Sequence, residues 1–442
     1  MLTYQDFLAL KEYEITDFVQ RVIRDHKTSA AYKNAVTADD YDAERNTTIL
    51  DFAKHIFTAN GTKIKDETVS NMKMTSNFFA RLNTQRCTYS LGNGLTFKKA
   101  EIKDKLGAES DKVIKDAGYY ALIHGVSYLY WAYDHIHIFK ATEFAPLWDE
   151  TSGNLGAGVR FWQLEADKPI NATLYTPDGY IEFTSKDGSL SSLAPVDGVV
   201  HAYRMTVSVT PATGEVATAH NYSALPVVPV WGSRLKQSTL IGMRSKIDAY
   251  DIINSGFAND LQDCAQIYWL ISGAGGATEQ ELSKFRERLL YRHIAQFDGD
   301  NVSVTPHTQE VPYEAREKLL TRIKAQIYED FGGLDVHTVA AGATNDHIDA
   351  AYQPMDENAD DFEYQIIDAI QKLLALQNIN GNDATPQFKR NRVSNQREQV
   401  EILMLEAPYL DEETLLNKFP NISSEEVEEI QKKKTAEDLS RF

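Results

Sequence analysis

The order of apolar and polar positions divides the first half of the chain into a helical region and a strand-rich region. Residues 1–90 follow a mostly helical pattern that ends at the turn signal Gly92-Asn93-Gly94, and residues 109–124 follow another helical pattern. From Val126 to about Val230 the chain is rich in β-branched and aromatic residues and is interrupted by turn pairs such as Asp178-Gly179. This region is therefore predicted to be a series of strands.

Two long helices with a small insert between them are predicted next. Apolar residues recur at three- and four-residue spacing in a helix that begins near Leu240 and in another from about Pro312 to Phe331. The insert reads as strand, helix and strand, in "IYWLISG", "TEQELSKFRERLLYRHI" and "NVSVTPHTQEV". The residues expected to pack on the apolar faces of the two long helices are Leu240, Met243, Ile247, Tyr250, Leu319, Ile323 and Ile327.

A stretch of small residues, "HTVAAGATNDHIDAAY", begins at His337. It follows Gly332-Gly333, which should stop the second long helix, and precedes a third helix expected over Glu357–Gln377. A simple helix–helix connection needs only about 2–8 residues, so a longer functional loop is predicted here, with an ordinary flexible connection as the alternative. The charged, helical end of the chain starts near Asn395 and is divided by Pro408 and Pro420.

The composition is that of an acidic globular protein. The chain has 442 residues, 43% of them hydrophobic, and a formal net charge of −19. No apolar run approaches the roughly 18–20 residues of a membrane span, and acids among the first residues argue against a secretory signal. The two cysteines, Cys87 and Cys264, suggest a reducing compartment. The negative charge argues against tight binding of nucleic acid but leaves light contact with DNA open.

Motifs for catalysis or cofactor binding are missing from the sequence. "ISGAGGATEQEL" has the layout of a phosphate loop but lacks its lysine and the third glycine of a dinucleotide fingerprint, so a tight turn into a capped helix is expected. His135 and His137 share one strand face without an evident third metal ligand. No catalytic residues, metal ligands or cofactor sites are predicted, and an enzyme is unsupported.

Basic residues are gathered in three places within this acidic chain. Each group is explained either by solvated faces and local acidic partners or by a mildly positive lining for DNA. The groups are Arg286, Arg288 and Arg292 in the insert helix, Arg316, Lys318, Arg322 and Lys324 in the second long helix, and Lys389, Arg390, Arg392 and Arg397 farther along.

The order of these elements resembles the portal protein, or head-to-tail connector, of tailed bacteriophages, in the form found in long-tailed siphophages. The resemblance rests on "NFFARLNTQRCTYSLGNGLTF", on "LPVVPVWGS" followed by "MRSKIDAYDIINSGFANDLQD", and on "LNKFPNISSEEVEEIQK", and it runs from about residue 30 to 432. The chain departs from the family where an Asn-x-Ser-Gly-type turn is common, because it has "GATNDHIDAAY" there.

The resemblance implies a mainly helical, ring-forming α+β multidomain portal fold. It implies a wing at 1–232, stem helices at 233–263 and 311–333, an α/β clip at 264–310, a tunnel loop at 334–352, a wing helix and strand at 353–393, and a crown at 394–442. The tunnel-loop residues expected to face DNA are Ala340, Ala341, Gly342, Ala343, Thr344 and Asn345. In the clip, Arg286, Arg288 and Arg292 are candidates for docking.

The resemblance also implies partners and a location. It implies a dodecameric homo-oligomer, a channel for weak, sequence-independent contact with double-stranded DNA, and docking of the terminase large subunit and then a head–tail adaptor. Scaffolding and major capsid proteins are further expected partners, with the virion as location and the host cytoplasm during assembly. The alternatives are another ring-forming head–tail or capsid-assembly component and, from a different class, a cytoplasmic enzyme with an unrecognised site.

Overall fold

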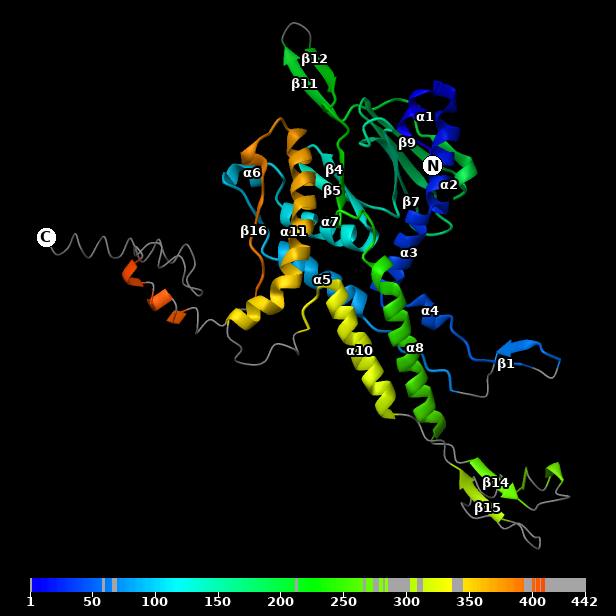
Figure 1. Cartoon of the computed structure of the whole chain (residues 1–442). Helices are drawn as coiled ribbons and strands as arrows, with labels where there is room; N and C mark the ends of the chain where they lie inside the picture. Colours follow the sequence, from blue (N-terminus) through cyan, green and yellow to red (C-terminus); the bar gives the residue numbers. More distant parts are fainter. Residues whose placement is uncertain are drawn as a thin grey trace. The chain divides into compact units, whose positions relative to one another are not determined.

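The computed structural model of the chain describes residues 2–57, 60–65, 70–210, 214–264, 268–272, 278–280, 283–284, 303–307, 313–335, 345–392, 400–401, 403–405 and 407–409. The chain divides into two compact units (Figure 1). Unit 1 comprises Met1–Ala43, Asn77–Met243 and Tyr328–Phe442, and unit 2 comprises Glu44–Ser76 and Arg244–Ile327. The α-helices of unit 1 are α1 Tyr4–Leu8, α2 Ile15–Thr28, α3 Ala30–Asp42, α5 Phe78–Leu91, α6 Ala100–Asp104, α7 Ser110–His124 and α11 Asn345–Ala375.

Antiparallel strands make up the rest of unit 1. One sheet has five strands in the order β10-β9-β8-β7-β6, and another has three in the order β13-β4-β5. Two-stranded pairs join β11 with β12 and β16 with β3. The strands are β3 Leu95–Thr96, β4 Val126–Ala132, β5 His135–Lys140, β6 Phe144–Trp148, β7 Leu155–Trp162, β8 Asn171–Thr176, β9 Gly179–Ser185, β10 Leu193–Pro195, β11 Arg204–Thr210, β12 Gly214–His220, β13 Val227–Trp231 and β16 Gln387–Phe388.

Helix α2 covers the five-stranded sheet. Its apolar residues Phe18, Val19, Val22 and Ile23 recur at helical spacing and are fully or almost fully buried. They share one core with inward-facing residues of the sheet, which include Val159, Ala172, Leu174 and Phe183. Alternation along the strands places these side chains on a single face.

Helices α5, α7 and α11 pack around the three-stranded sheet. Their core joins Leu91 of α5, Ala121 of α7 and Ile366 and Ile370 of α11 to Leu129 of β4. Gly118 permits a close approach of α7, because a Cβ atom at this position would lie 2.8 Å from Leu91 Cδ1 and 2.9 Å from Phe362 Cζ. This core fixes the carboxyl-terminal half of α11 against the sheet.

Unit 2 contains most of both long helices and two pairs of antiparallel strands. Helix α8 spans Leu240–Cys264 and α10 spans Tyr313–Phe331, and the unit boundary falls at 243/244 in α8 and at 327/328 in α10. The other elements are α4 Thr47–Leu50, β1 His55–Phe57 paired with β2 Lys63–Lys65, and β14 Tyr268–Ser272 paired with β15 Ser303–His307. Within the unit, the rings of Phe257 and Tyr313 lie 6.0 Å apart and connect the two helices.

The sequence pattern predicted most of these elements. The helix at 109–124, the series of strands, both long helices and the two strands of the insert are confirmed. The expectation for residues 1–90 was incomplete, because β1 and β2 form a hairpin among the helices. The expected helix near 278–294 lies largely outside the described residues.

The predicted start of the third helix was wrong. Helix α11 begins at Asn345, not near Glu357, and continues through Pro354. Residues 345–352, assigned to the loop, are therefore helical. Ile348, Tyr352 and Met355 are spaced by four and three residues and are buried against Tyr89, which stabilises these first turns. The surrounding small and acidic residues concealed this short apolar pattern in the sequence.

Candidate functional site

The connection between α10 and α11 is anchored to α5. Gly332 has a φ of +64°, a conformation that favours glycine, and ends α10. Gln85 then accepts a hydrogen bond from the Leu334 N–H (3.0 Å) and donates one to its carbonyl (2.9 Å). The Arg86 guanidinium lies 4.3 Å from the Phe331 ring centroid and donates to the Phe331 carbonyl at 2.5 Å. Residues entering the predicted tunnel loop are thus held in place.

The other end of that loop leads into a helix that is also anchored on α5. The ring of Tyr352 on α11 stacks on that of Tyr89 on α5, with centroids 5.6 Å apart. Residues 336–344 lie outside the described residues, and these include Ala340, Ala341, Gly342, Ala343 and Thr344. Asn345, also assigned to the loop, is the first residue of α11. The loop assignment therefore stays a prediction between two structured ends.

A carboxylate cluster follows one face of α11 and binds two arginines. Arg390 forms 2.9 Å ion pairs with Asp356 and Glu363 and a further ion pair with Asp360. Arg392 pairs with Asp349 at 2.9 Å and also with Asp356. The four acids recur at intervals of seven, four and three residues, which places them on the same side of the helix.

Tyr89 completes this cluster from α5. Its hydroxyl donates to Asp356 at 2.6 Å and accepts from Arg392 Nε at 2.8 Å. Burial alone would raise the pKa of Asp356, but the hydrogen bonds from Arg392 and Tyr89 hold it below its ordinary value. Burial and the bond to Asp356 raise the pKa of Tyr89 to about 12. The cluster fastens residues 389–392 to α11 and α5.

The basic residues singled out in the sequence therefore differ in their surroundings. Arg390 and Arg392 are bound by carboxylates of the same chain. Arg316 pairs with Asp260 at 2.5 Å, and Lys318 lies 3.7 Å from Glu314. Lys324 is half-buried and also interacts within the chain. Arg322 and Lys389 are exposed.

The residues predicted to pack the stem differ in how far the single chain buries them. Leu240, Met243, Ile247 and Ile327 are buried within a single chain, whereas Tyr250 and Ile323 are half-buried. Leu319 keeps 44% of its surface exposed. Because Ile247 is only 1% exposed, an aspartate there would destabilise the chain itself, and Leu319 is the better position for testing contacts between chains.

A polar ladder on α8 was missed in the sequence. Asn259 accepts from the Met72 N–H at 2.6 Å and donates to its carbonyl at 3.2 Å, and Ser255 accepts from the Met74 N–H at 2.9 Å. One turn earlier, Asp251 accepts from Asn46 Nδ2 at 2.7 Å, and burial raises its pKa. Four residues of a helix rise about 6 Å along its axis, and two residues of an extended segment span about 6.6 Å. The side chains of α8 and the backbone of residues 70–76 therefore stay in register.

The signal for this ladder was the four-residue spacing of Asp251, Ser255 and Asn259 inside a long helix. Each of the three side chains is almost fully buried. Buried polar groups require partners. The backbone of Met72 and Met74 supplies them for Asn259 and Ser255, and the Asn46 side chain supplies one for Asp251. The ladder thus fixes an extended strap along α8 in unit 2.

We expect Asn259→Leu to release this strap. The change keeps the volume but leaves the Met72 N–H and carbonyl without partners, which costs about 1–3 kcal/mol. Hydrogen exchange should accelerate at the Met72 and Met74 amides, and chemical denaturation should show the loss of stability. Gln262→Leu, at an exposed position of the same helix, is the control. Unchanged exchange at both amides would show that the ladder does not hold the strap.

The remaining sequence candidates show no further site in the described part of the chain. His135 and His137 do share a face, with their Nε2 atoms 2.8 Å apart and Asp134 at 2.5 Å from His135 Nδ1. Among the described residues, no group of three or more His, Cys, Asp or Glu side chains has an arrangement that could hold a metal ion. Arg286, Arg288, Arg292 and Arg397 lie outside the described residues, as does nearly all of the predicted crown.

The structure defines a mixed α+β protein in which two long helices dominate one unit and two antiparallel sheets dominate the other. Among its described helices, none carries an apolar run long enough to span a bilayer. The chain belongs to the family described as phage portal protein, SPP1 Gp6-like, whose model matches residues 21–438.

One curated relative carries the same description, and two solved structures show a more distant likeness. The chain is 28% identical over 246 residues to the portal protein of Clostridium phage phiCD119, a match that covers 51% of this chain and 54% of that protein. The match thus spans about half the length of this curated relative. Among solved structures, a chain from the neck of a native GTA particle is 11% identical, with 78% of this chain and 90% of that chain covered and a TM-score of 0.41. A chain from the neck of an empty GTA particle is 10% identical, with 77% and 88% covered and a TM-score of 0.42.

Proposed function

We propose that the chain forms a ring at one capsid vertex and that its central channel conducts double-stranded DNA during packaging and ejection. The family match over residues 21–438 is the observation that carries this proposal. We propose a dodecameric ring, which docks first the terminase large subunit and then a head–tail adaptor, and which meets scaffolding and major capsid proteins during assembly in the host cytoplasm. The chain would act as a structural conduit without catalysis of its own and remain in the virion.

The proposed parts follow the element order. Residues 1–232 and 345–393 would form the wing, 233–263 and 311–333 the stem, 264–310 the clip, 334–344 the tunnel loop and 394–442 the crown. The wing and stem proposals are supported by the cores and helices described above. The clip is small, so we expect its surface to be buried against neighbouring clips.

The electrostatics favour weak contact with DNA. Arg316, Arg390 and Arg392 are paired at 2.5–2.9 Å with acids of the same chain, so little of their charge is available to phosphates. Fewer neutralised phosphates mean lower, less salt-dependent affinity. A conduit of this kind would let DNA slide, with Arg322 and Lys389 as the exposed candidates for contact.

We expect the combined change Ala341→Trp and Gly342→Pro to block DNA packaging. Copies of the loop would crowd the channel axis, so a large, stiffened loop should obstruct the duplex. The measurement is the amount of DNase-protected DNA in a packaging reaction reconstituted with procapsids that contain the variant ring. Ala341→Ser, which keeps the side chain small, is the control. Normal packaging by procapsids with the bulky loop would contradict the proposed channel position.

A further inference from the structure

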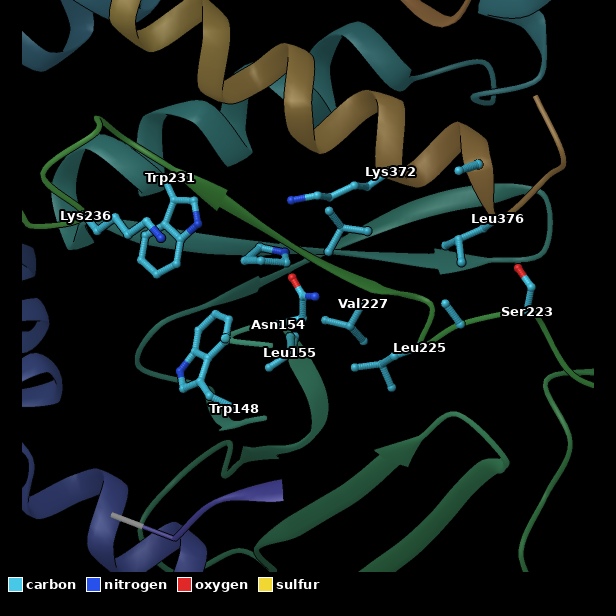
Figure 2. A pocket seen from close by; sticks show the side chains of 15 residues that line it. Trp148, Asn154, Leu155, Ser223, Leu225, Val227, Trp231, Lys236, Lys372 and Leu376 are labelled. Carbon is cyan, nitrogen blue, oxygen red and sulfur yellow. The ribbon is translucent and has the colours of Figure 1, made fainter. Parts of the chain in front are cut away.

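A pocket of about 430 Å³ lies in unit 1, where three parts of the chain converge (Figure 2). Its walls come from the connection between β6 and β7, from the residues that lead into and form β13, and from the last turn of α11. Its volume lies within the roughly 300–1,000 Å³ of typical ligand sites. The residues of interest are Trp148, Asn154, Ser223, Leu225, Trp231, Lys236, Lys372 and Leu376.

The wall between β6 and β7 is fixed by a tight turn. The Asp149 carboxylate accepts hydrogen bonds from the N–H groups of Thr151 (2.7 Å) and Ser152 (2.8 Å), and the Asp149 N–H donates to the Asn154 carbonyl at 2.8 Å. A shift of the β6–β7 register at Leu147 and Trp148 precedes this turn. The pocket is therefore preformed on this side.

The two ends of the pocket differ in chemistry. At one end, the rings of Trp148 and Trp231 are stacked, 5.8 Å apart with an interplanar angle of 22°. The Lys236 ammonium lies 4.8 Å from the Trp231 ring centroid. At the other end, Leu225 and Leu376 present aliphatic side chains (Figure 2). A ligand that fills the pocket must therefore be amphipathic.

Lys236 adopts a backbone conformation that few lysines adopt. Its φ is +53°, in the left-handed region that is unfavourable for a residue with a Cβ atom. A hydrogen bond from its N–H to the Ser233 carbonyl (3.0 Å) supports the turn. Strain of this kind is often kept at binding sites, and here it keeps an ammonium group at the edge of the aromatic wall.

The charge of the pocket is opposite to that of the chain. Its lining includes Lys236 and Lys372 but no aspartate or glutamate, although the whole chain carries −19. Lys372 pairs with Asp368 at 2.7 Å outside the lining, and both side chains are about half exposed. Among the described residues, no carboxylate lies within ion-pair distance of Lys236.

The end of α11 does not oppose a bound anion strongly. Its Leu374 carbonyl accepts from the N–H groups of Gln377 (2.9 Å) and Ile379 (3.1 Å), and its Ala375 carbonyl accepts from Asn378 (3.0 Å). These bonds satisfy carbonyls that would otherwise carry the negative end of the helix dipole. The ammonium group of Lys372, half exposed beside Asp368, is therefore the charged group that this wall contributes to the lining.

We infer that this pocket binds an acidic peptide segment of another protein, in which carboxylate side chains flank a large apolar or aromatic residue. The carboxylates face Lys236 and Lys372, and the apolar side chain packs on the tryptophan and leucine walls. Asn154 and Ser223, both exposed at the rim, offer an amide and a hydroxyl to the backbone of the segment. This docking function is independent of the DNA channel.

Isothermal titration calorimetry on the full-length protein tests the inference. The probe is the acetylated and amidated peptide Ser-Asp-Glu-Leu-Phe-Asp-Ser, and the comparison peptide has its acids replaced by the matching amides. We expect micromolar binding of the acidic peptide that weakens as salt is added. The combined change Lys236→Glu and Lys372→Glu should raise the dissociation constant by at least about tenfold.

The control is the combined change Lys98→Glu and Lys186→Glu, which gives the same net charge at two exposed positions of unit 1 that do not line the pocket. It should bind the acidic peptide as the unchanged protein does. Three results would each overturn the inference: no detectable heat with the acidic peptide, equal binding of the amide peptide, or equal affinities for the pocket variant and the control.

Discussion

Replacing Leu319 by aspartate is expected to convert rings of this chain into monomers. Leu319 lies on α10 and is 44% exposed in the single chain. Two other apolar residues of unit 2 are also exposed, Tyr313 on the same helix (55%) and Leu261 on α8 (53%). A ring would cover these apolar groups with the neighbouring copy. A carboxylate buried there without a cationic partner costs several kcal/mol at each interface.

Mass photometry of the purified variant measures the effect. Thr321→Asp is the matched control, because it adds the same charge two residues away, at an exposed position more than half a turn around α10. The control should assemble and the Leu319 variant should not. If both variants form rings as readily as the unchanged chain, α10 does not contribute this face to the assembly.

Replacing Arg390 by methionine is expected to destabilise unit 1 by about 3 kcal/mol, because it leaves several partly buried carboxylates without their cation. The exposed fractions of the side chains are 23% for Arg390, 20% for Asp356 and 12% for Glu363, so solvent screens the pairs only in part. The Arg390→Lys variant should be more stable than the Arg390→Met variant but less stable than the unchanged protein, since an ammonium group cannot make the bidentate contacts of a guanidinium.

Urea denaturation and hydrogen exchange at Asn391 measure this effect. The Asn391 N–H donates to the Tyr89 carbonyl at 2.9 Å and should exchange faster once the cluster is broken. Adding Glu363→Gln to Arg390→Met should restore stability in part, because it removes one of the unpaired charges. Lys389→Met, at the exposed neighbour, is the control. Equal stability of the Arg390 and Lys389 variants would mean that the cluster does not fasten this segment.

The sequence predicted elements whose signal is local. The spacing of Leu240, Met243 and Ile247 identified α8, and Gly332 marked the end of α10, because helix periodicity and a left-handed glycine are both properties of a few neighbouring residues. The start of α11 escaped because only Ile348, Tyr352 and Met355 mark it, and their burial depends on Tyr89 more than 250 residues earlier in the chain.

The partners of the charged and polar residues could not be predicted in the same way. Arg390 and Arg392 were grouped as possible contacts for DNA, but the fold brings them to carboxylates of α11. Ser255 and Asn259 bond to a backbone segment about 180 residues away in the chain, and Asp251 bonds to the side chain of Asn46, which is 205 residues away. Such contacts are seen only in the three-dimensional structure, since the sequence pattern does not specify which distant segments come together.

Cryo-electron microscopy of the purified full-length chain tests the central claim most directly. The account predicts closed rings with an axial channel wide enough for a DNA duplex, with α10 leading to the segment at 336–344 on the channel wall. Only monomers or dimers, or a closed assembly without an axial channel, would contradict it.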